Sequence, residues 1–214
     1  MPPTKPAVGR RHGSGRKGDD REKSILDAAE DLLAREGFEA MTVEAIARGA
    51  GISRASLYFY FGSKQDVLTA LVGRTMEAIN ADARAASTNT SVEPTSVVLD
   101  GIATTESFWR EHGVVMQAAI EVGQTIPAIK ELWSTTLERS VHGYSAAFVR
   151  AGFEDGPGPS QSVSLSRSLC YMVERSFYWS HATTGTDKLH EVTETCQQIW
   201  LATLSSIGDG PDRS

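Results

Sequence analysis

Apolar residues recur along the chain at intervals of three and four, as they do on one face of a helix. The first such face consists of Ile25, Leu26, Ala29, Leu32 and Leu33. Asp19, with Glu22 three residues later, matches the pattern that caps a helix at its N-terminus, and Gly37 suits a helix C-terminus. The sequence contains no strand-like alternation of apolar and polar residues that is bounded by hairpin turns. The pattern predicts an all-α chain without internal repeats, whose first helix starts at Asp19.

Proline marks further boundaries, because it is excluded from helix interiors. None occurs between Pro6 and Pro94. We expect this interval to contain a short helix after Thr42, a second short helix capped by Ser53, and a long helix over residues 63–87. Further helices are predicted at about 95–112, 114–123, 128–151, 161–183 and 187–207, which makes about nine in all.

Residues 42–64 combine two short helices with a tight turn that contains glycine. Ala47 is small enough for the helices to approach closely, and Gly51 allows the turn a positive φ. Ile52 and Leu57 can be buried to fix the angle between the helices. This is the pattern of a helix-turn-helix, whose second helix enters the major groove of DNA.

The candidate DNA contacts lie in this segment. They are Thr42, Ser53, Arg54, Ala55, Ser56, Tyr58, Tyr60 and Lys64. An arginine near the start of the second helix can bind guanine through two hydrogen bonds, and tyrosine hydroxyls can reach phosphates. A lysine in the first turn of a helix opposes the helix dipole unless a phosphate is bound there. Each residue alone also suits packing or solvent exposure, but together they favour DNA binding.

The net charge of −6 argues weakly against a nucleic-acid partner, yet the charge is unevenly distributed. The first 18 residues contain basic residues but no acidic ones, and they are rich in glycine and proline. Such an arm suits contact with a polyanion, and equally a disordered solubilising tail. Most acidic residues of the following segment fall on the first helix, where they can face away from DNA.

The remaining composition is that of an ordinary globular protein of 214 residues, 40% hydrophobic and 22% charged. No apolar run approaches the roughly 20 residues that cross a membrane, and no apolar segment follows the basic N-terminus as it would in a signal peptide. Cys170 and Cys196 cannot form a disulfide framework, and no Cys/His cluster suits zinc. We expect a cytoplasmic protein that does not associate with a membrane and binds no metal or cofactor.

Aromatic residues, including all four tryptophans, are concentrated in the second half of the chain. An aromatic lining suits a small apolar ligand, although aromatic residues at helical spacing are equally typical of a plain core. The candidate ligand-binding residues are Phe108, Trp109, Trp133, Tyr144, Phe148, Met172, Phe177 and Trp200. Helices 161–183 and 187–207 are apolar on several sides, which suits either a homodimer contact or a monomeric core.

Three segments resemble the DNA-binding signature of the TetR family of bacterial repressors: residues 42–47 (TVEAIA), 50–53 (AGIS) and 57–64 (LYFYFGSK). Sparser matches in both halves, among them residues 131–135 (ELWST), resemble a mycobacterial branch of that family. The resemblance implies a nine-helix homodimer formed through the last two helices, which binds a double-stranded, palindromic operator. It also implies a small ligand in the C-terminal part that releases the DNA. Ala55, Ser56 and Tyr60 depart from the residues frequent in the family, so the operator sequence is left open.

Two other functions remain possible at this point, a small all-α enzyme and a protein-interaction module that does not bind DNA. No histidine has metal-ligand spacing and no carboxylate pair suggests acid–base catalysis, so no catalytic residue is assigned. An interaction module would leave residues 42–64 unexplained. The expected organisation is a flexible basic arm (1–18), a helix-turn-helix domain (19–66), a ligand-binding and dimerisation domain (67–208) and a tail (209–214).

Overall fold

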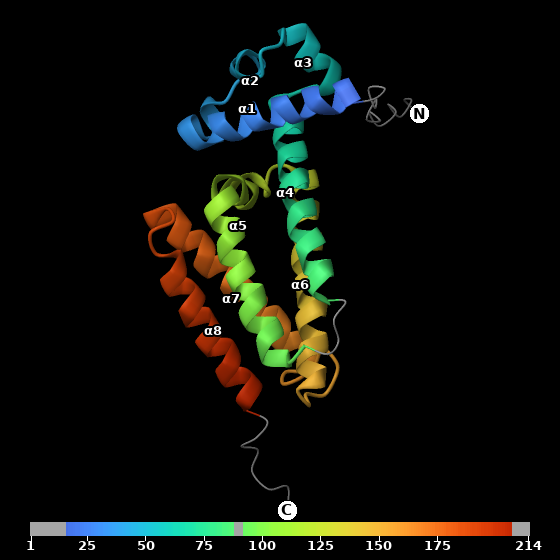
Figure 1. Ribbon diagram of the computed structural model, residues 1–214, viewed down its shortest axis with the longest axis vertical. Coiled ribbons are helices and arrows are strands. Elements are labelled where there is room, and N and C mark those ends of the chain that lie inside the picture. Colours follow the sequence, from blue (N-terminus) through green and yellow to red (C-terminus); the bar gives the residue numbers. More distant parts are fainter. Residues whose placement is uncertain (1–15, 88–91, 207–214) are drawn as a thin grey trace, which may run out of the picture. The chain divides into compact units, whose positions relative to one another are not determined.

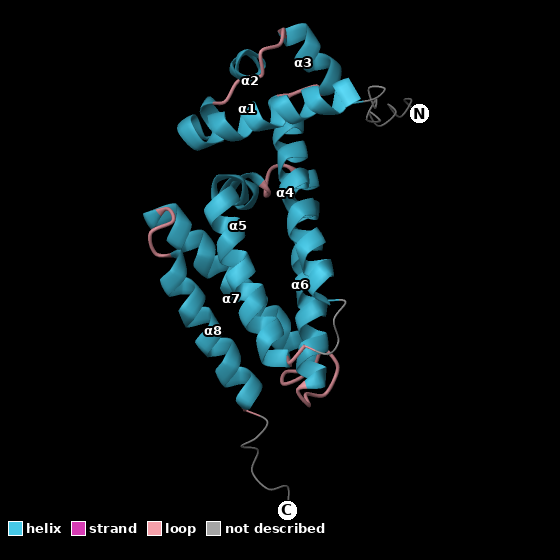
Figure 2. Ribbon diagram, viewed as in Figure 1, coloured by secondary structure: helices cyan, strands magenta, loops and turns pink. Residues whose placement is uncertain are grey.

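The computed structural model describes residues 16–87 and 92–206, and the regular structure within these ranges is helical throughout (Figure 2). The helices are α1 (Arg16–Ala40), α2 (Val43–Gly49), α3 (Arg54–Tyr60), α4 (Lys64–Ser87), α5 (Pro94–Val122), α6 (Pro127–Arg150), α7 (Ser162–Thr184) and α8 (Leu189–Ser205). The described residues form two compact units, which divide between Leu71 and Val72. This boundary falls inside α4, which Figure 1 labels. The all-α prediction is confirmed.

Two boundaries differ from those expected. The helices predicted at 95–112 and 114–123 are one element, α5, whose backbone leaves the helical range only at His112 (φ −124°, ψ 20°). No proline separates the two stretches, so a local kink is enough. The helix predicted from Asp19 begins at Arg16, one turn earlier than its expected cap, because the first N–H groups of a helix need no partner within the helix. Residues 16–18 are therefore helical, while residues 1–15 of the predicted arm and the predicted tail lie outside the described residues.

The N-terminal unit is built around the apolar face of α1, as the sequence pattern predicts. Its core consists of Ile25, Ala29, Leu32, Met41, Ile46, Leu57, Leu68 and Leu71, all buried. A Cβ placed on Gly49 of α2 would lie 3.1 Å from the Ala28 Cβ of α1. The glycine thus permits the two helices to approach closely, and this close contact fixes α2 as the support for α3.

The C-terminal unit consists of the end of α4 and helices α5 to α8, which pack against one another around large aromatic side chains. Its buried residues include Ile102, Trp109, Ile129, Val141, Phe148, Phe177, Leu189 and Trp200. A buried hydrogen bond from Asn80 Nδ2 to Thr136 Oγ1 (3.2 Å) joins α4 to α6. No helix in the described ranges is long and apolar enough to cross a membrane.

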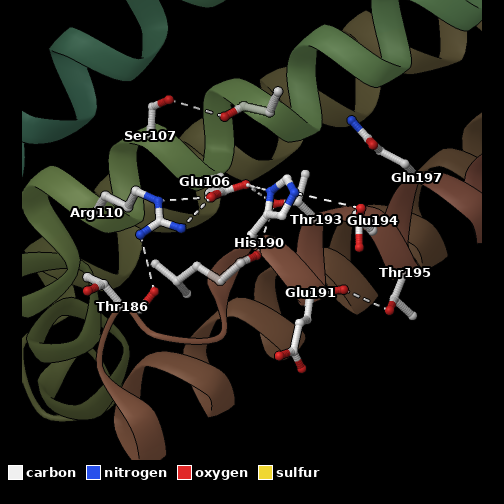
Figure 3. A network of polar contacts seen from close by, with 12 residues as sticks. Glu106, Ser107, Arg110, Thr186, His190, Glu191, Thr193, Glu194, Thr195 and Gln197 are labelled. Carbon is white, nitrogen blue, oxygen red and sulfur yellow. Dashed lines mark hydrogen bonds and ion pairs between the residues drawn. The ribbon is translucent and has the colours of Figure 1, made fainter.

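A polar network joins α5 to α8 (Figure 3). The Glu106 carboxylate of α5 accepts two hydrogen bonds from Arg110 (2.6 and 2.8 Å) and one from Thr193 Oγ1 of α8 (2.6 Å). His190 Nδ1 lies 3.4 Å from the same carboxylate, and Arg110 also donates to the Thr186 carbonyl oxygen before α8. These contacts fix the start of α8 against α5.

Candidate functional site

The turn between α2 and α3 has the geometry expected from its sequence. Gly51 adopts φ 66°, so the prediction of a positive φ is confirmed. Thr42 Oγ1 accepts a hydrogen bond from the Ala45 N–H (3.2 Å), and Ser53 Oγ accepts one from the Ser56 N–H (3.1 Å). Each side chain thereby caps its helix, and each hydroxyl keeps its own proton to donate elsewhere.

Arg54 at the start of α3 already has two partners in the protein. Its Nη1 lies 2.7 Å from Glu44 Oε1 of α2, and its guanidinium carbon lies 5.9 Å from the centroid of the Tyr58 ring. The Tyr58 side chain and the Glu44 charge together raise the pKa of Arg54. Glu44 was not among the candidate residues of this surface. Its position in the first turn of α2 suggests only a favourable helix dipole interaction, and its contact with Arg54 follows from the angle between the helices.

Lys64 at the start of α4 is partly buried, in contrast to the free ammonium group expected for a phosphate contact. Its Nζ donates to the carbonyl oxygens of Phe38 and Glu39 at the end of α1, both at 3.0 Å, and lies 4.6 Å from the Phe38 ring centroid. These contacts satisfy two of its three N–H groups and explain a cation at a helix N-terminus without DNA. The third N–H is what remains for a phosphate.

The other candidates on α3 differ in exposure. Ala55 and Tyr58 are exposed, whereas Ser56 and Tyr60 are partly buried. Tyr60 packs edge-on against Phe59, whose side chain is 58% exposed and was not among the candidates. The eight predicted residues therefore lie at the N-cap of α2, at the N-cap of α3, along α3 and at the first residue of α4. Arg54, Tyr60 and Lys64 already have partners inside the protein.

The C-terminal unit contains a cavity of about 110 Å³. It is lined by Met76, Ile79, Ile102, Thr105, Phe108, Trp109, Met116, Trp133, Thr136, Leu137, Ser140, Tyr144, Cys170, Val173, Glu174 and Trp200. Small-molecule sites usually measure about 300–1,000 Å³, so this conformation has room for only a short or flat molecule. A larger ligand would have to displace a side chain of the lining.

Five of the eight residues predicted to bind a ligand line this cavity: Phe108, Trp109, Trp133, Tyr144 and Trp200. The other three do not. Phe177 stacks behind Trp109, with ring centroids 6.4 Å apart, and Phe148 packs behind Trp200 at 5.8 Å. Met172 lies on α7 outside the lining. Helical periodicity identifies buried side chains, but which of them border a void depends on how neighbouring helices fit together.

Glu174 of α7 also lines the cavity and was not among the predicted ligand-binding residues. Its Oε1 accepts a hydrogen bond from Trp133 Nε1 (3.3 Å), and burial raises its pKa despite the nearby Arg175 charge. Trp200 supplies a second unusual polar group, because its buried Nε1–H has no hydrogen-bond partner among the described residues. A cavity lined by apolar side chains and a few polar groups with unused hydrogen-bonding capacity is suited to hold a small ligand.

Two of the more exposed aromatic residues in the C-terminal unit lie on α7. Tyr171 is 48% exposed and Trp179 is 60% exposed. Ile199 on α8 is also exposed, and α7 packs against α8. Each of the two last helices thus exposes at least one large apolar side chain. Within residues 16–87 and 92–206, no cluster of histidine, cysteine, aspartate or glutamate is arranged to bind a metal.

Comparison with known proteins identifies the family. Residues 25–71 match the bacterial regulatory proteins of the tetR family, and residues 98–206 match the C-terminal domain of the transcriptional regulator EthR. The HTH-type transcriptional regulator EthR of Mycolicibacterium smegmatis is 31% identical over 190 residues, which cover 87% of each chain. EthR of Mycobacterium tuberculosis is 30% identical over 191 residues, covering 87% of this chain and 88% of the relative. The mycobacterial resemblance expected from the sequence is thus confirmed.

Solved structures agree with this assignment at the level of the fold. The fatty acid degradation regulator FadR from Bacillus halodurans superposes with a TM-score of 0.73 at 17% identity, covering 88% of this chain and 96% of that chain. A TetR-like transcriptional regulator from a Rhodococcus species superposes with a TM-score of 0.69 at 18% identity, covering 91% and 100%. The chain therefore belongs to the TetR family of bacterial transcriptional regulators, with a C-terminal domain of the EthR type.

Proposed function

We propose that this protein is a repressor that binds a palindromic operator as a homodimer and is released from it by a small apolar or aromatic molecule. The observation that carries the proposal is that α4 contributes residues both to the DNA-binding segment and to the cavity. This one helix begins at Lys64, next to the DNA-binding helices, and contributes Met76 and Ile79 to the lining of the cavity. A ligand in the cavity would therefore touch the same helix whose first residues follow the helix-turn-helix.

The DNA-binding step rests on α3. Arg54 reads a base edge, Ala55 allows close approach, and Thr42, Ser53, Ser56 and Tyr58 supply hydroxyl groups for phosphates or bases. The remaining N–H of Lys64 binds a phosphate. Tyr60, which packs against Phe59, offers its hydroxyl at the end of the helix.

The dimer rests on α7 and α8, and its support is the exposed apolar surface that includes Tyr171, Trp179 and Ile199. A two-fold axis there would present two α3 helices to successive major grooves, roughly 34–36 Å apart. A ligand that binds more tightly when the two α3 helices are not spaced for successive major grooves weakens operator binding. A coupling of roughly 1–3 kcal/mol corresponds to a 5- to 150-fold loss of affinity. Operator binding places the protein in the cytoplasm, where bacterial DNA is found.

The test is binding of the purified full-length protein to the intergenic DNA upstream of its own gene, followed by fluorescence anisotropy at several salt concentrations. We expect tight binding that is lost on unrelated DNA, with a log–log salt slope of about −0.9 for each neutralised phosphate. If neither this DNA nor a library selected from the whole genome yields a specific site, the repressor proposal is wrong. An enzyme or a protein-interaction module would then be the alternative.

A further inference from the structure

The C-terminal cavity is one-sided in the charge that its lining can carry. Its lining includes one carboxyl group, that of Glu174, and no lysine, arginine or histidine. Burial raises the pKa of the Tyr144 hydroxyl and raises the pKa of the Cys170 thiol to about 12, so both stay neutral near pH 7. Glu174 is therefore the one lining side chain able to carry charge under physiological conditions.

Glu174 is only weakly satisfied by the protein. Its hydrogen bond from Trp133 Nε1 is long, at 3.3 Å, whereas an ionised carboxylate can accept about four hydrogen bonds. The adjacent Arg175 is directed elsewhere, with its guanidinium carbon 5.0 Å from the centroid of the Tyr178 ring. The carboxylate thus retains free acceptor capacity beside an apolar cavity, where the nearby Arg175 charge compensates its charge only in part and burial raises its pKa.

The rest of the lining also favours positive charge. Trp109, Trp133, Tyr144 and Trp200 surround the cavity with aromatic rings, whose faces attract a cation. The hydroxyl groups of Thr105 and Ser140 already donate to backbone carbonyl oxygens, at 2.9 and 3.3 Å. They offer little to an anion. The unpaired Trp200 Nε1–H is a donor that a ligand oxygen can use, but no basic side chain of the lining would stabilise a full negative charge.

We propose that the cavity selects an apolar molecule that ends in a protonated amine, with its ammonium group paired to Glu174 and its apolar body among the tryptophan rings. The inference rests on the proposed function only in treating the cavity as the ligand site. A carboxylic acid of the same length is disfavoured, because its charge has the same sign as that of Glu174. A neutral alcohol leaves the carboxylate without a counter-ion.

The first experiment compares three probes of equal chain length, n-hexylamine, n-hexanol and n-hexanoate, on the full-length protein. Binding is measured by calorimetry and by the fluorescence of the tryptophans that line the cavity. We expect n-hexylamine to bind at least about tenfold more tightly than n-hexanol, and n-hexanoate to bind most weakly. No binding of n-hexylamine, or equal or tighter binding of n-hexanoate, would overturn the inference.

The second experiment compares Glu174→Gln with Glu131→Gln, which removes an equal charge from an exposed position of α6 outside the cavity. In Glu174→Gln we expect the advantage of the amine over the alcohol to disappear while n-hexanol binds at least as tightly as before. Glu131→Gln should keep the advantage. An advantage that survives in Glu174→Gln would contradict the role of this carboxylate. The comparison of the three probes on the wild-type protein decides the question even if the variant folds poorly.

Release of DNA is measured separately, so that the two proposals can fail independently. An amine that binds with the expected preference but leaves operator binding unchanged would support the cavity inference and contradict the ligand-responsive repressor. Release of the operator by n-hexanol and n-hexylamine at equal occupancy and equal affinity would support the repressor and overturn the selectivity for amines.

Discussion

The guanidinium group of Arg54 lies 2.7 Å from the carboxylate of Glu44, which joins the recognition helix α3 to the helix before it. Both side chains remain about half exposed, at 57% and 49%, so water screens the pair and the contact can open at little cost. In the absence of DNA, this contact orients Arg54 and neutralises it. On DNA, the guanidinium would exchange the carboxylate for a base edge or a phosphate.

Glu44→Gln should therefore raise the affinity for DNA of any sequence, because it frees Arg54 and removes a negative charge beside it. We expect a larger gain on unrelated DNA than on the operator, so that the ratio of the two affinities falls. The measurement is anisotropy on both DNAs at one salt concentration, with Glu36→Gln, an exposed position of α1, as the charge-matched control. Equal affinities of Glu44→Gln and wild type would show that the pair does not restrain Arg54.

Arg54→Ala should lose discrimination at one base pair of each half-site. An arginine bound to guanine through two hydrogen bonds discriminates by roughly 5- to 150-fold against the wrong base. The check is a set of single-base operator variants. At the position that Arg54 contacts, the mutant should bind the altered and the original operator equally, and at every other position it should discriminate as the wild type does. A uniform loss at all positions would instead indicate that Arg54 contacts phosphate.

Lys64→Met tests two roles of one ammonium group. The methionine keeps an apolar stem against Phe38 but removes both hydrogen bonds to the α1 carbonyl oxygens. We expect the free energy of unfolding to fall by about 1–3 kcal/mol, as for other hydrogen bonds to charged groups. If the third N–H also binds phosphate, the log–log salt slope for the operator becomes shallower by about 0.9 per site. Unchanged stability in urea denaturation would contradict the structural role of Lys64. An unchanged salt slope would contradict its contact with phosphate.

Gly101→Ala should alter the cavity, although alanine usually stabilises a helix. A Cβ at Gly101 would collide with the Tyr144 hydroxyl, so the tyrosine ring has to move within the cavity lining. We expect a loss of about 1–3 kcal/mol in unfolding free energy and altered binding of small ligands. Gly143→Ala in α6 is the matched control, since its Cβ would meet nothing within 4 Å. It should stabilise the protein by about 0.5–1 kcal/mol. Equal stabilisation by both substitutions would contradict the predicted collision.

Glu106 should make stability depend on acid pH. Burial alone would raise its pKa, but hydrogen bonds from Thr193, Arg110 and His190 and the Arg110 charge lower the pKa below its ordinary value of 4.5. A carboxyl group with a lowered folded-state pKa stabilises the protein above the unfolded-state pKa, and this contribution is lost as pH falls through the folded-state value. Unfolding free energy should thus decline below about pH 5 in the wild type and decline less steeply in Glu106→Gln. Parallel pH profiles of the two proteins would contradict this role.

The local chemistry of the N-terminal unit could be predicted from the sequence because it depends on near neighbours. Thr42 and Ser53 cap helices that begin one residue later, and the positive φ of Gly51 follows from a turn only a few residues long. The contacts of Lys64 could not be predicted in this way. Its partners Phe38 and Glu39 precede it by about 25 residues, and only the packing of α4 onto the end of α1 brings them together.

The sequence by itself determined the helices, the helix-turn-helix and the family of this protein, because helical periodicity, caps and turn residues act over a few positions. The tertiary structure alone decided which aromatic residues border a cavity and that Glu174 supplies the one carboxyl group of its lining. Phe177 and Trp109 are equally buried, yet only Trp109 faces the void. The reason is physical: burial is a property of one helix face, whereas a cavity exists only where the side chains of several helices fail to fill the space between them.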